Sequence, residues 1–485
     1  MSRVSVNKPN ILVIMVDQMA HDVIGALGHP TVLTPNLDAL VRRGVAFDHA
    51  YCNSPICVSS RVSFMTGRLV RHTNAFDNGS EFPASLPTFA HRLNLAGYTT
   101  ILSGKMHFVG PDQLHGFRER LTPDISPTGF ELTPDWTRGP YPNPGTSVQR
   151  LRYPPVRPWS LQLAYDEEVL HHTLARLRRL ALEDAPFFLC ASFSHPHDPF
   201  LTPEPYWAAY EDRPVAPPNV EAHDEDLHPF NRWIQIHHEA DRFPLTPEET
   251  LRARRAYYAA VSYVDSIVGR LLAELDRVGL GDTLVVFTSD HGEMLGEHGM
   301  WFKRTFYDGA AKVPLIVSRP STFAPARRSE VVSLVDLTAT LLDLAEVEAP
   351  SDADGGSLKP LLSGSGGPWK DFAVSEYFSE GTVEPMLMLR AGRFKFVYVH
   401  EQAPLLFDLQ ADPYEQRDLA SDSAYAIVRE ELQAALLAGL DVSELRERIV
   451  RGQHERLLIA AATRDASAWK YRPSPDAVLY ERPKS

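Results

Sequence analysis

Short apolar runs recur along the chain, and segments with the spacing of amphipathic helices separate them. Four runs rich in branched and aromatic side chains are residues 10–16, 98–102, 186–193 and 283–288. Continuous runs of this kind are typical of parallel strands buried on both faces. Helical spacing is clearest over residues 165–182, and a Thr-Pro-Glu-Glu start at Thr246 predicts a long helix to about residue 278. The alternation predicts an α/β fold with a largely parallel central sheet sandwiched by helices.

The pattern changes after a glycine- and serine-rich stretch at residues 351–369. Three short strands then follow at residues 374–378, 386–390 and 394–399. They predict a small antiparallel sheet with a following helix. We therefore expect a catalytic domain at 1–365, a C-terminal α+β subdomain at 366–456 and a tail at 457–485. The tail has little regular pattern, and we expect it to wrap a neighbouring subunit in a homo-oligomer, a dimer or a tetramer.

Composition narrows the class of protein. The 485 residues are 44% hydrophobic and carry a formal charge of −14, which argues against binding to nucleic acid. Three cysteines provide no disulfide framework and fit a reducing cytoplasm. The first apolar run, Ile11 to Val16, is too short for a signal peptide or a membrane span, and no later run is long enough. The sequence thus predicts a cytoplasmic protein without a membrane partner.

Polar side chains that could ligate a metal or take part in catalysis follow the predicted strands. They are Asp17, Gln18, Lys105, His107, His195, His197, Asp290 and His291. The carboxyl ends of parallel strands meet at one sheet edge, so these groups predict a single site. Oxygen ligands from Asp17, Gln18 and Asp290 suit Ca²⁺, Mg²⁺ or Mn²⁺, and His291 adds a nitrogen. Cationic side chains, including Arg61, Lys105 and Lys303, would stabilise a tetrahedral oxyanion beside the metal.

For two further segments, the sequence pattern fits more than one role. Cys57-Val-Ser-Ser-Arg61 reads as a loop entering a helix, and a buried structural thiol is the commonest role of such a cysteine. Residues 121–160 are rich in proline, and four arginines without an acid lie between residues 137 and 159. That stretch fits either a solvated surface loop or a lid facing the substrate.

The motifs together resemble those of the formylglycine-dependent sulfatases of the alkaline phosphatase superfamily. The resemblance is carried by Val-Asp17-Gln18, Cys57-x-x-Ser-Arg61, Gly104-Lys-Met-His107, His195-Pro-His197-Asp-Pro, Ser289-Asp-His-Gly292 and Lys303. It covers nearly the whole chain. Residues 103–117 and 290–303 look most like the choline sulfatases. The resemblance implies an alkaline-phosphatase-like fold, an enzyme that cleaves small sulfate esters, and a formylglycine-generating enzyme as partner during maturation.

The resemblance also implies roles for individual residues. Cys57 would be oxidised to formylglycine, whose hydrate attacks sulfur and later collapses to release sulfate. Asp17, Gln18, Asp290 and His291 would hold one divalent metal, for which we expect Ca²⁺, with Mn²⁺ or Mg²⁺ as alternatives. Arg61 and Lys105 would orient the hydrate, and His107 would be the base for its collapse. His197 and Lys303 would bind sulfate and help protonate the leaving oxygen. Asn78 would add another sulfate or substrate contact, and His195 would either bind substrate or only support its loop.

Two features depart from the resemblance. Ser59 stands where the family has proline or alanine, within the signal that the maturing enzyme reads. The four arginines of the 121–160 stretch would repel choline, which family members grip through aromatic and acidic groups. We therefore expect an anionic or neutral sulfate ester rather than choline sulfate.

Two rival functions follow. A phosphonate monoester or phosphodiester hydrolase of the same superfamily resembles this chain, but that branch carries uncharged hydroxyl residues where this chain has Lys105 and His107. A catalytically silent homologue that serves in binding or assembly is the other, and it would follow if Cys57 is not matured.

Overall fold

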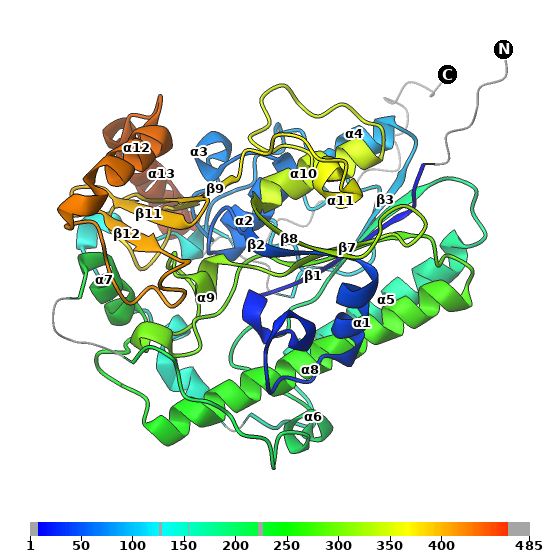
Figure 1. Cartoon of the computed structure of the whole chain (residues 1–485), viewed down its shortest axis with the longest axis horizontal. Helices are drawn as coiled ribbons and strands as arrows, with labels where there is room; N and C mark the ends of the chain where they lie inside the picture. Colours follow the sequence, from blue (N-terminus) through cyan, green and yellow to red (C-terminus); the bar gives the residue numbers. More distant parts are fainter. Residues whose placement is uncertain (1–7, 126–128, 154, 222–226, 464–485) are drawn as a thin grey trace.

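The computed structural model describes residues 8–125, 129–153, 155–221 and 227–463. A twisted sheet runs through its centre (Figure 1). This sheet has eight strands in the order β4-β3-β5-β1-β6-β7-β2-β8. The strands are β1 (Ile11–Val16), β2 (Val45–Tyr51), β3 (Thr99–Gly104), β4 (Glu119–Arg120), β5 (Phe187–Ser192), β6 (Leu284–Ser289), β7 (Leu315–Ser318) and β8 (Ala326–Ser333). All ladders are parallel except those of β7, which runs antiparallel to both β6 and β2. The predicted α/β class with a largely parallel sheet is confirmed.

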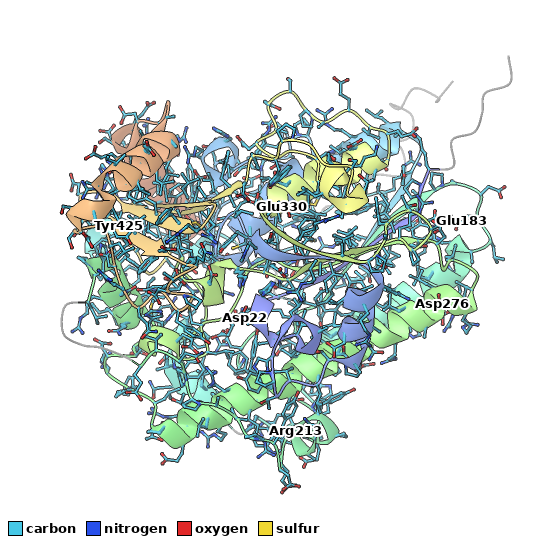
Figure 2. All side chains as sticks on the ribbon, viewed as in Figure 1. Asp22, Glu183, Arg213, Asp276, Glu330 and Tyr425 are labelled. Atoms are coloured by element: carbon cyan, nitrogen blue, oxygen red, sulfur yellow. The ribbon has the colours of Figure 1, made fainter. Side chains whose placement is uncertain are left out.

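Helices cover both faces of this sheet. One layer contains α1 (Pro35–Arg43), α5 (Leu161–Leu180) and α8 (Pro247–Arg277), and the other contains α2 (Cys57–Thr66), α4 (Phe89–Leu95) and α10 (Leu334–Leu344). Strand β1 shows why the runs are apolar throughout, since all six of its residues are buried. Leu12 and Ile14 pack in the first layer, whereas Val13 and Met15 pack in the second. Side chains fill the space on both sides of the sheet (Figure 2).

A second, four-stranded antiparallel sheet has the order β12-β11-β10-β9. Its strands are β9 (Phe372–Tyr377), β10 (Met386–Ala391), β11 (Phe394–Val399) and β12 (Leu405–Asp408), and α12 (Ala426–Leu437) and α13 (Val442–Thr463) follow it. Lys395 on β11 is fully buried, and its Nζ donates to Asp308 Oδ1 at 2.6 Å and to Glu415 Oε1 at 2.7 Å. Because Asp308 lies in the segment between β6 and β7 of the large sheet, this charged cluster joins the two sheets.

Some elements were not predicted from the pattern. Strand β8 lies at the sheet edge, and its first half is polar and partly exposed, so it carries no long apolar run. Helix α13 continues through residues 457–463 of the expected tail, and the remainder of that tail lies outside the described residues. Shorter helices are α3 (Val70–Thr73), α6 (Glu204–Ala208), α7 (Pro229–His237), α9 (Asp308–Ala311) and α11 (Lys359–Ser363). Within the described ranges, no helix has the length and apolar character needed to cross a bilayer.

Candidate active site

The ends of four neighbouring strands bring the predicted polar groups to one edge of the large sheet. Asp17 and Gln18 follow β1, Lys105 follows β3, and Asp290 follows β6. Strand β5 lies between β3 and β1, and the loop after it carries His197. Close contact between β3 and β5 requires glycine at position 104, where a Cβ would lie 1.9 Å from the carbonyl oxygen of Ser192. The sheet order therefore places these side chains within reach of one another.

Four of these side chains form a compact group of metal-capable atoms. Asp17, Cys57, Asp290 and His291 each offer one ligand atom, and these atoms lie within 4.8 Å of one another. All four residues are buried. The Cys57 Sγ lies 3.3 Å from His291 Nε2. Two buried carboxylates and an imidazole fit a divalent cation, because a cation would balance charges that water cannot reach.

Arg61, one turn along α2 from Cys57, ties the two carboxylates together. It is fully buried, and its Nη2 donates to Asp17 Oδ2 at 3.0 Å while its Nε donates to Asp290 Oδ2 at 2.8 Å. Its Nη1 donates to the carbonyl oxygen of Lys105 and to Ser192 Oγ. Burial opposes the charge of this guanidinium, yet the two carboxylates raise the pKa of Arg61 above its ordinary value.

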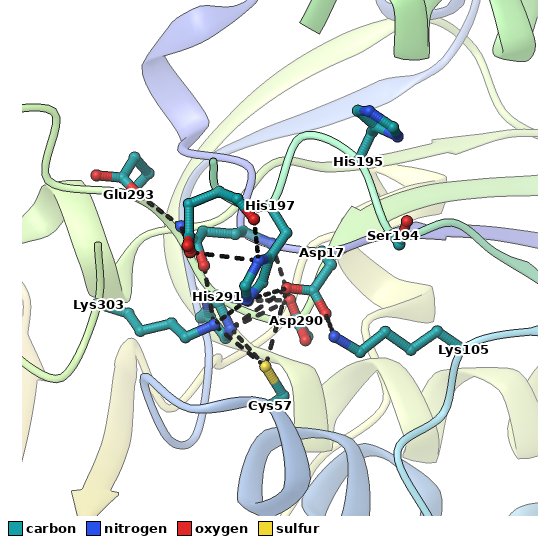
Figure 3. A network of polar contacts seen from close by, with 12 residues as sticks. Asp17, Cys57, Lys105, Ser194, His195, His197, Asp290, His291, Glu293 and Lys303 are labelled. Atoms are coloured by element: carbon teal, nitrogen blue, oxygen red, sulfur yellow. Dashed lines mark hydrogen bonds and ion pairs between the residues drawn. The ribbon is translucent and has the colours of Figure 1, made fainter. Parts of the chain in front are cut away.

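Two lysines approach residue 57 and Asp17 from opposite sides (Figure 3). Lys105 Nζ lies 2.7 Å from Asp17 Oδ2, and Lys303 Nζ lies 3.3 Å from Cys57 Sγ. Burial alone would raise the pKa of the Cys57 thiol, but Lys303 and Lys105, followed by His291, hold it well below its ordinary value. A hydrogen bond from His107 lowers the same pKa further. The site thus favours negative charge at residue 57.

The two carboxylates respond differently to this environment. Burial works against ionisation of Asp17, but Lys105, His197 and Lys303 lower its pKa below the ordinary value. Burial dominates at Asp290 and raises its pKa, although Arg61 opposes the shift. Asp17 therefore remains ionised, and a cation bound between the two would lower the pKa of Asp290 as well.

The two histidines after β5 lie in different places. His197 Nε2 is 2.9 Å from Lys303 Nζ, so this ring belongs to the cluster. His195 is fully buried and points away from it (Figure 3). Its Nδ1 pairs with Asp166 Oδ2 at 2.6 Å and its Nε2 lies 3.0 Å from the carbonyl oxygen of Leu201. Both ring nitrogens of His195 are therefore engaged in holding the loop.

Asn78 lies beside the start of α2. Its Oδ1 accepts from the backbone N–H of Val58 at 3.2 Å, and its Nδ2 donates to Glu380 Oε1 at 3.4 Å. Glu380 also accepts from Arg304 Nη2 at 2.8 Å. Asn78 thus connects the N-terminal end of α2 to a buried ion pair formed by the loop after Lys303 and the loop after β9.

Sequence reasoning assigned no role to two carboxylates that the structure places against Gln18. Gln18 Nε2 donates to Glu293 Oε2 at 2.6 Å and to Asp198 Oδ1 at 3.3 Å. Asp198 stands inside the His195-Pro-His197-Asp-Pro motif, and Glu293 directly follows Gly292, the last residue of the Ser289-Asp-His-Gly292 motif. Their positions next to assigned residues were the only signal, because the contact depends on how distant loops fold.

The arginines of the 121–160 stretch have partners that the linear sequence does not reveal. Arg150 Nη1 lies 2.9 Å from Asp198 Oδ2, and Arg152 Nε donates to Glu249 Oε1 at 2.9 Å. The guanidinium carbon of Arg138 lies 4.4 Å from the centre of the Tyr141 ring. Acids from other segments therefore pair with two of the four arginines, Arg150 and Arg152.

A buried edge of carboxylates, imidazoles and lysines around one residue suits metal-assisted transfer of an oxyanion group. The chain matches the sulfatase family over residues 9–347, and residues 296–441 match the C-terminal region of N-sulphoglucosamine sulphohydrolase. The chain belongs to the sulfatase family. This confirms the family membership predicted from the motifs.

Individual relatives cover almost the whole chain. A choline-sulfatase of Rhizobium meliloti (strain 1021) is 38% identical over 96% of this chain and 94% of its own length. An arylsulfatase of Clostridium perfringens is 30% identical over 90% of this chain and 95% of its own. Among solved structures, the phosphonate monoester hydrolase of Agrobacterium radiobacter has a TM-score of 0.71 and 27% identity, covering 91% of this chain and 96% of that one.

Proposed function

We propose that this sulfatase-family chain hydrolyses a small organic sulfate ester to an alcohol and inorganic sulfate, with formylglycine formed from Cys57 as the nucleophile. The observation that carries the proposal is the position of residue 57. Its side chain lies at the focus of the cluster, 3.3 Å from Lys303 Nζ and 3.3 Å from His291 Nε2. A nucleophile at that point has cations on one side and metal-capable ligands on the other.

The residues that would hold the divalent cation are Asp17, Gln18, Asp290 and His291. When bound, the cation would supply Lewis-acid stabilisation of negative charge on the sulfuryl group. The oxygen-rich donor set supports Ca²⁺ as the ion, with Mn²⁺ or Mg²⁺ as alternatives.

The contacts support the roles proposed for the remaining residues. Arg61 and Lys105 fix Asp17 from two directions and so orient the groups beside residue 57. The hydrogen bond between His107 and residue 57 supports His107 as the base that would take a proton from it. Lys303 and His197 lie on the other side, 2.9 Å apart, where they would bind sulfate oxygens and supply a proton to the departing alcohol.

The structure and the relatives also bear on the alcohol that is released. The partners of Arg150 and Arg152 lower the positive charge that we expected to exclude choline. The name of the Rhizobium relative adds choline sulfate to the esters worth testing. We therefore define the substrate class as small organic sulfate esters and let a panel of substrates decide the alcohol.

Further parts of the proposal concern maturation and assembly. A formylglycine-generating enzyme would convert Cys57, and a reducing cytoplasm fits the three free cysteines. Exposed apolar side chains at the end of α13, Leu458 and Ile459, support a homo-oligomer.

The test uses the full chain co-expressed with a formylglycine-generating enzyme. Mass spectrometry of the peptide containing residue 57 measures conversion, and kcat/KM is measured on an aryl sulfate, choline sulfate and a phosphonate monoester. We expect conversion at residue 57 and higher kcat/KM for a sulfate ester. Cys57→Ala should abolish turnover. Cys190→Ala is the matched control, because Cys190 is an equally buried thiol in β5, and it should retain turnover.

The rival functions are distinguishable in the same experiment. A large preference for the phosphonate would establish the phosphonate monoester hydrolase, a class that the Agrobacterium structure represents. A wholly unmodified Cys57 together with no turnover on any ester would establish the silent homologue, for which Ser59 is the main support.

A further inference from the structure

The side-chain amide of Gln18 is held in one orientation by three contacts. Its Nε2 donates to Glu293 Oε2 at 2.6 Å and to Asp198 Oδ1 at 3.3 Å, and its Oε1 accepts from Lys303 Nζ at 2.8 Å. The nitrogen and oxygen of an amide have nearly the same shape, so its neighbours decide which end points where. Two acceptors on one end and a cationic donor on the other leave a single arrangement satisfied.

Glu293 makes the shorter contact and is itself held rigidly. It is buried, and its Oε1 accepts from the backbone N–H of Leu295 at 3.0 Å and of Phe302 at 2.7 Å. These bonds fix the carboxylate so that Oε2 faces Gln18. Asp198 is engaged elsewhere as well, with Arg150 at 2.9 Å and His197 Nδ1 at 3.2 Å.

We propose that Glu293 is a positioning residue that fixes the amide of Gln18 with its oxygen toward Lys303 Nζ, which also contacts Cys57 of the metal-capable group. If the amide turned, Gln18 would present an NH₂ group, which donates hydrogen bonds and cannot ligate a cation. Glu293 thus acts on the metal through Gln18, as outer partners of metal ligands do in other sites. The inference rests on the metal role of Gln18 proposed above.

A purely structural role for Glu293 would be to tie residues 293–302 together through Leu295 and Phe302. The variant Glu293→Gln separates the two roles. The oxygen of a glutamine at this position can still accept from both backbone N–H groups, which keeps the loop. Its nitrogen then faces Gln18 Nε2, so two donors meet and Gln18 must turn its oxygen away from the cation.

The experiment measures Ca²⁺ and Mn²⁺ affinity by calorimetry on matured, chelator-stripped protein. Folding is checked by the Tm in chelator. We expect Glu293→Gln to weaken cation binding by about 10- to 100-fold while it lowers the metal-free Tm by only about 1–3 °C, the cost of a buried donor left without an acceptor. Glu415→Gln is the matched control, since it makes the same change in a buried carboxylate of the Lys395 cluster, and its cation affinity should equal that of the wild type.

A second variant tests orientation directly. In the pair Gln18→Glu with Glu293→Gln, a carboxylate at position 18 accepts from the new amide and offers its other oxygen to the cation. We expect affinity to recover by about threefold or more relative to Glu293→Gln alone, since the two sites are coupled. Recovery stays incomplete, because Asp198 Oδ1 faces the new carboxylate.

The outcomes separate the two proposals. If the wild type binds no divalent cation, the proposed function fails. If the wild type binds and Glu293→Gln binds equally well, only the role of Glu293 is overturned. Weak binding by both the single variant and the folded pair also overturns it, because orientation would not be the cause. If the single variant does not fold, cation binding by the folded pair decides alone.

Discussion

Removal of the Arg61 side chain tests how strongly the site depends on balanced buried charge. Arg61→Met keeps a long apolar side chain but leaves Asp17 and Asp290 without their shared cation. Breaking a buried ion pair from one side costs about 3–5 kcal/mol. Two pairs share this guanidinium, and their contributions overlap, so about 4 kcal/mol is a conservative loss of unfolding free energy.

This loss converts into a shift in Tm. Unfolding entropy near the midpoint is about 2.1 cal/mol/K per residue, which for 485 residues is about 1 kcal/mol/K if the two sheets unfold together. The buried Lys395 cluster between the sheets supports a single transition. Arg61→Met should therefore lower the Tm by about 4 °C in chelator. Added Ca²⁺ should raise the Tm of the variant more than that of the wild type, because the two buried carboxylates have lost the guanidinium that balanced their charge.

The assay is thermal unfolding in chelator and in saturating Ca²⁺. Arg417→Met is the matched control, because Arg417 forms an exposed pair with Asp422 and exposed pairs contribute about 1 kcal/mol or less. A loss below about 1 °C for Arg61→Met in chelator would refute the claim that this guanidinium balances the two carboxylates.

Three further predictions concern catalysis, pH and the loop after β5. Lys105→Met should lower kcat/KM by about 10²-fold or more, since it removes a cation paired with Asp17, and a loss below about threefold would contradict its role. Burial raises the pKa of Glu415 to about 7, above its unfolded value, so the folded state binds the extra proton and wild-type stability falls as pH rises from about 5 to 7. The Tm of Glu415→Gln relative to wild type should therefore rise by roughly 2–3 °C over that range, and a flat difference would count against this. His195→Asn should lower the Tm by about 1–2 °C through loss of the bond to Leu201, while kcat/KM stays within about threefold; a large kcat loss at unchanged Tm would place His195 in the chemistry.

The apolar pattern predicted the strands that matter most for the site. Runs at β1, β3, β5 and β6 are long and continuous because both faces of these strands are buried. Their polar ends then predicted the cluster, since parallel strands deliver such residues to the same edge. Strand β8 was missed because an edge strand with exposed polar residues carries little of this signal.

The directions in which individual side chains point could not be predicted from the sequence. His195 and His197 are two residues apart, yet one ring is engaged by Asp166 and the other contacts Lys303. The partner of Gln18, Glu293, is 275 residues away along the chain. Such contacts depend on the paths of loops after different strands, and no local periodicity encodes those paths. The same holds for Arg150, whose acidic partner Asp198 comes from another loop.

Because the site is assembled from distant strands, it cannot form until most of the chain has been synthesised. His291, which contacts residue 57, lies 234 residues downstream of it. At elongation rates of about 5–20 residues per second, roughly 10–50 seconds pass between synthesis of Cys57 and synthesis of the segment that encloses it. Throughout that interval the central strand β1 lacks its neighbour β6, so the pocket around the thiol cannot close. The order of strands in the sheet thus opens a period during translation when Cys57 is accessible to a modifying enzyme.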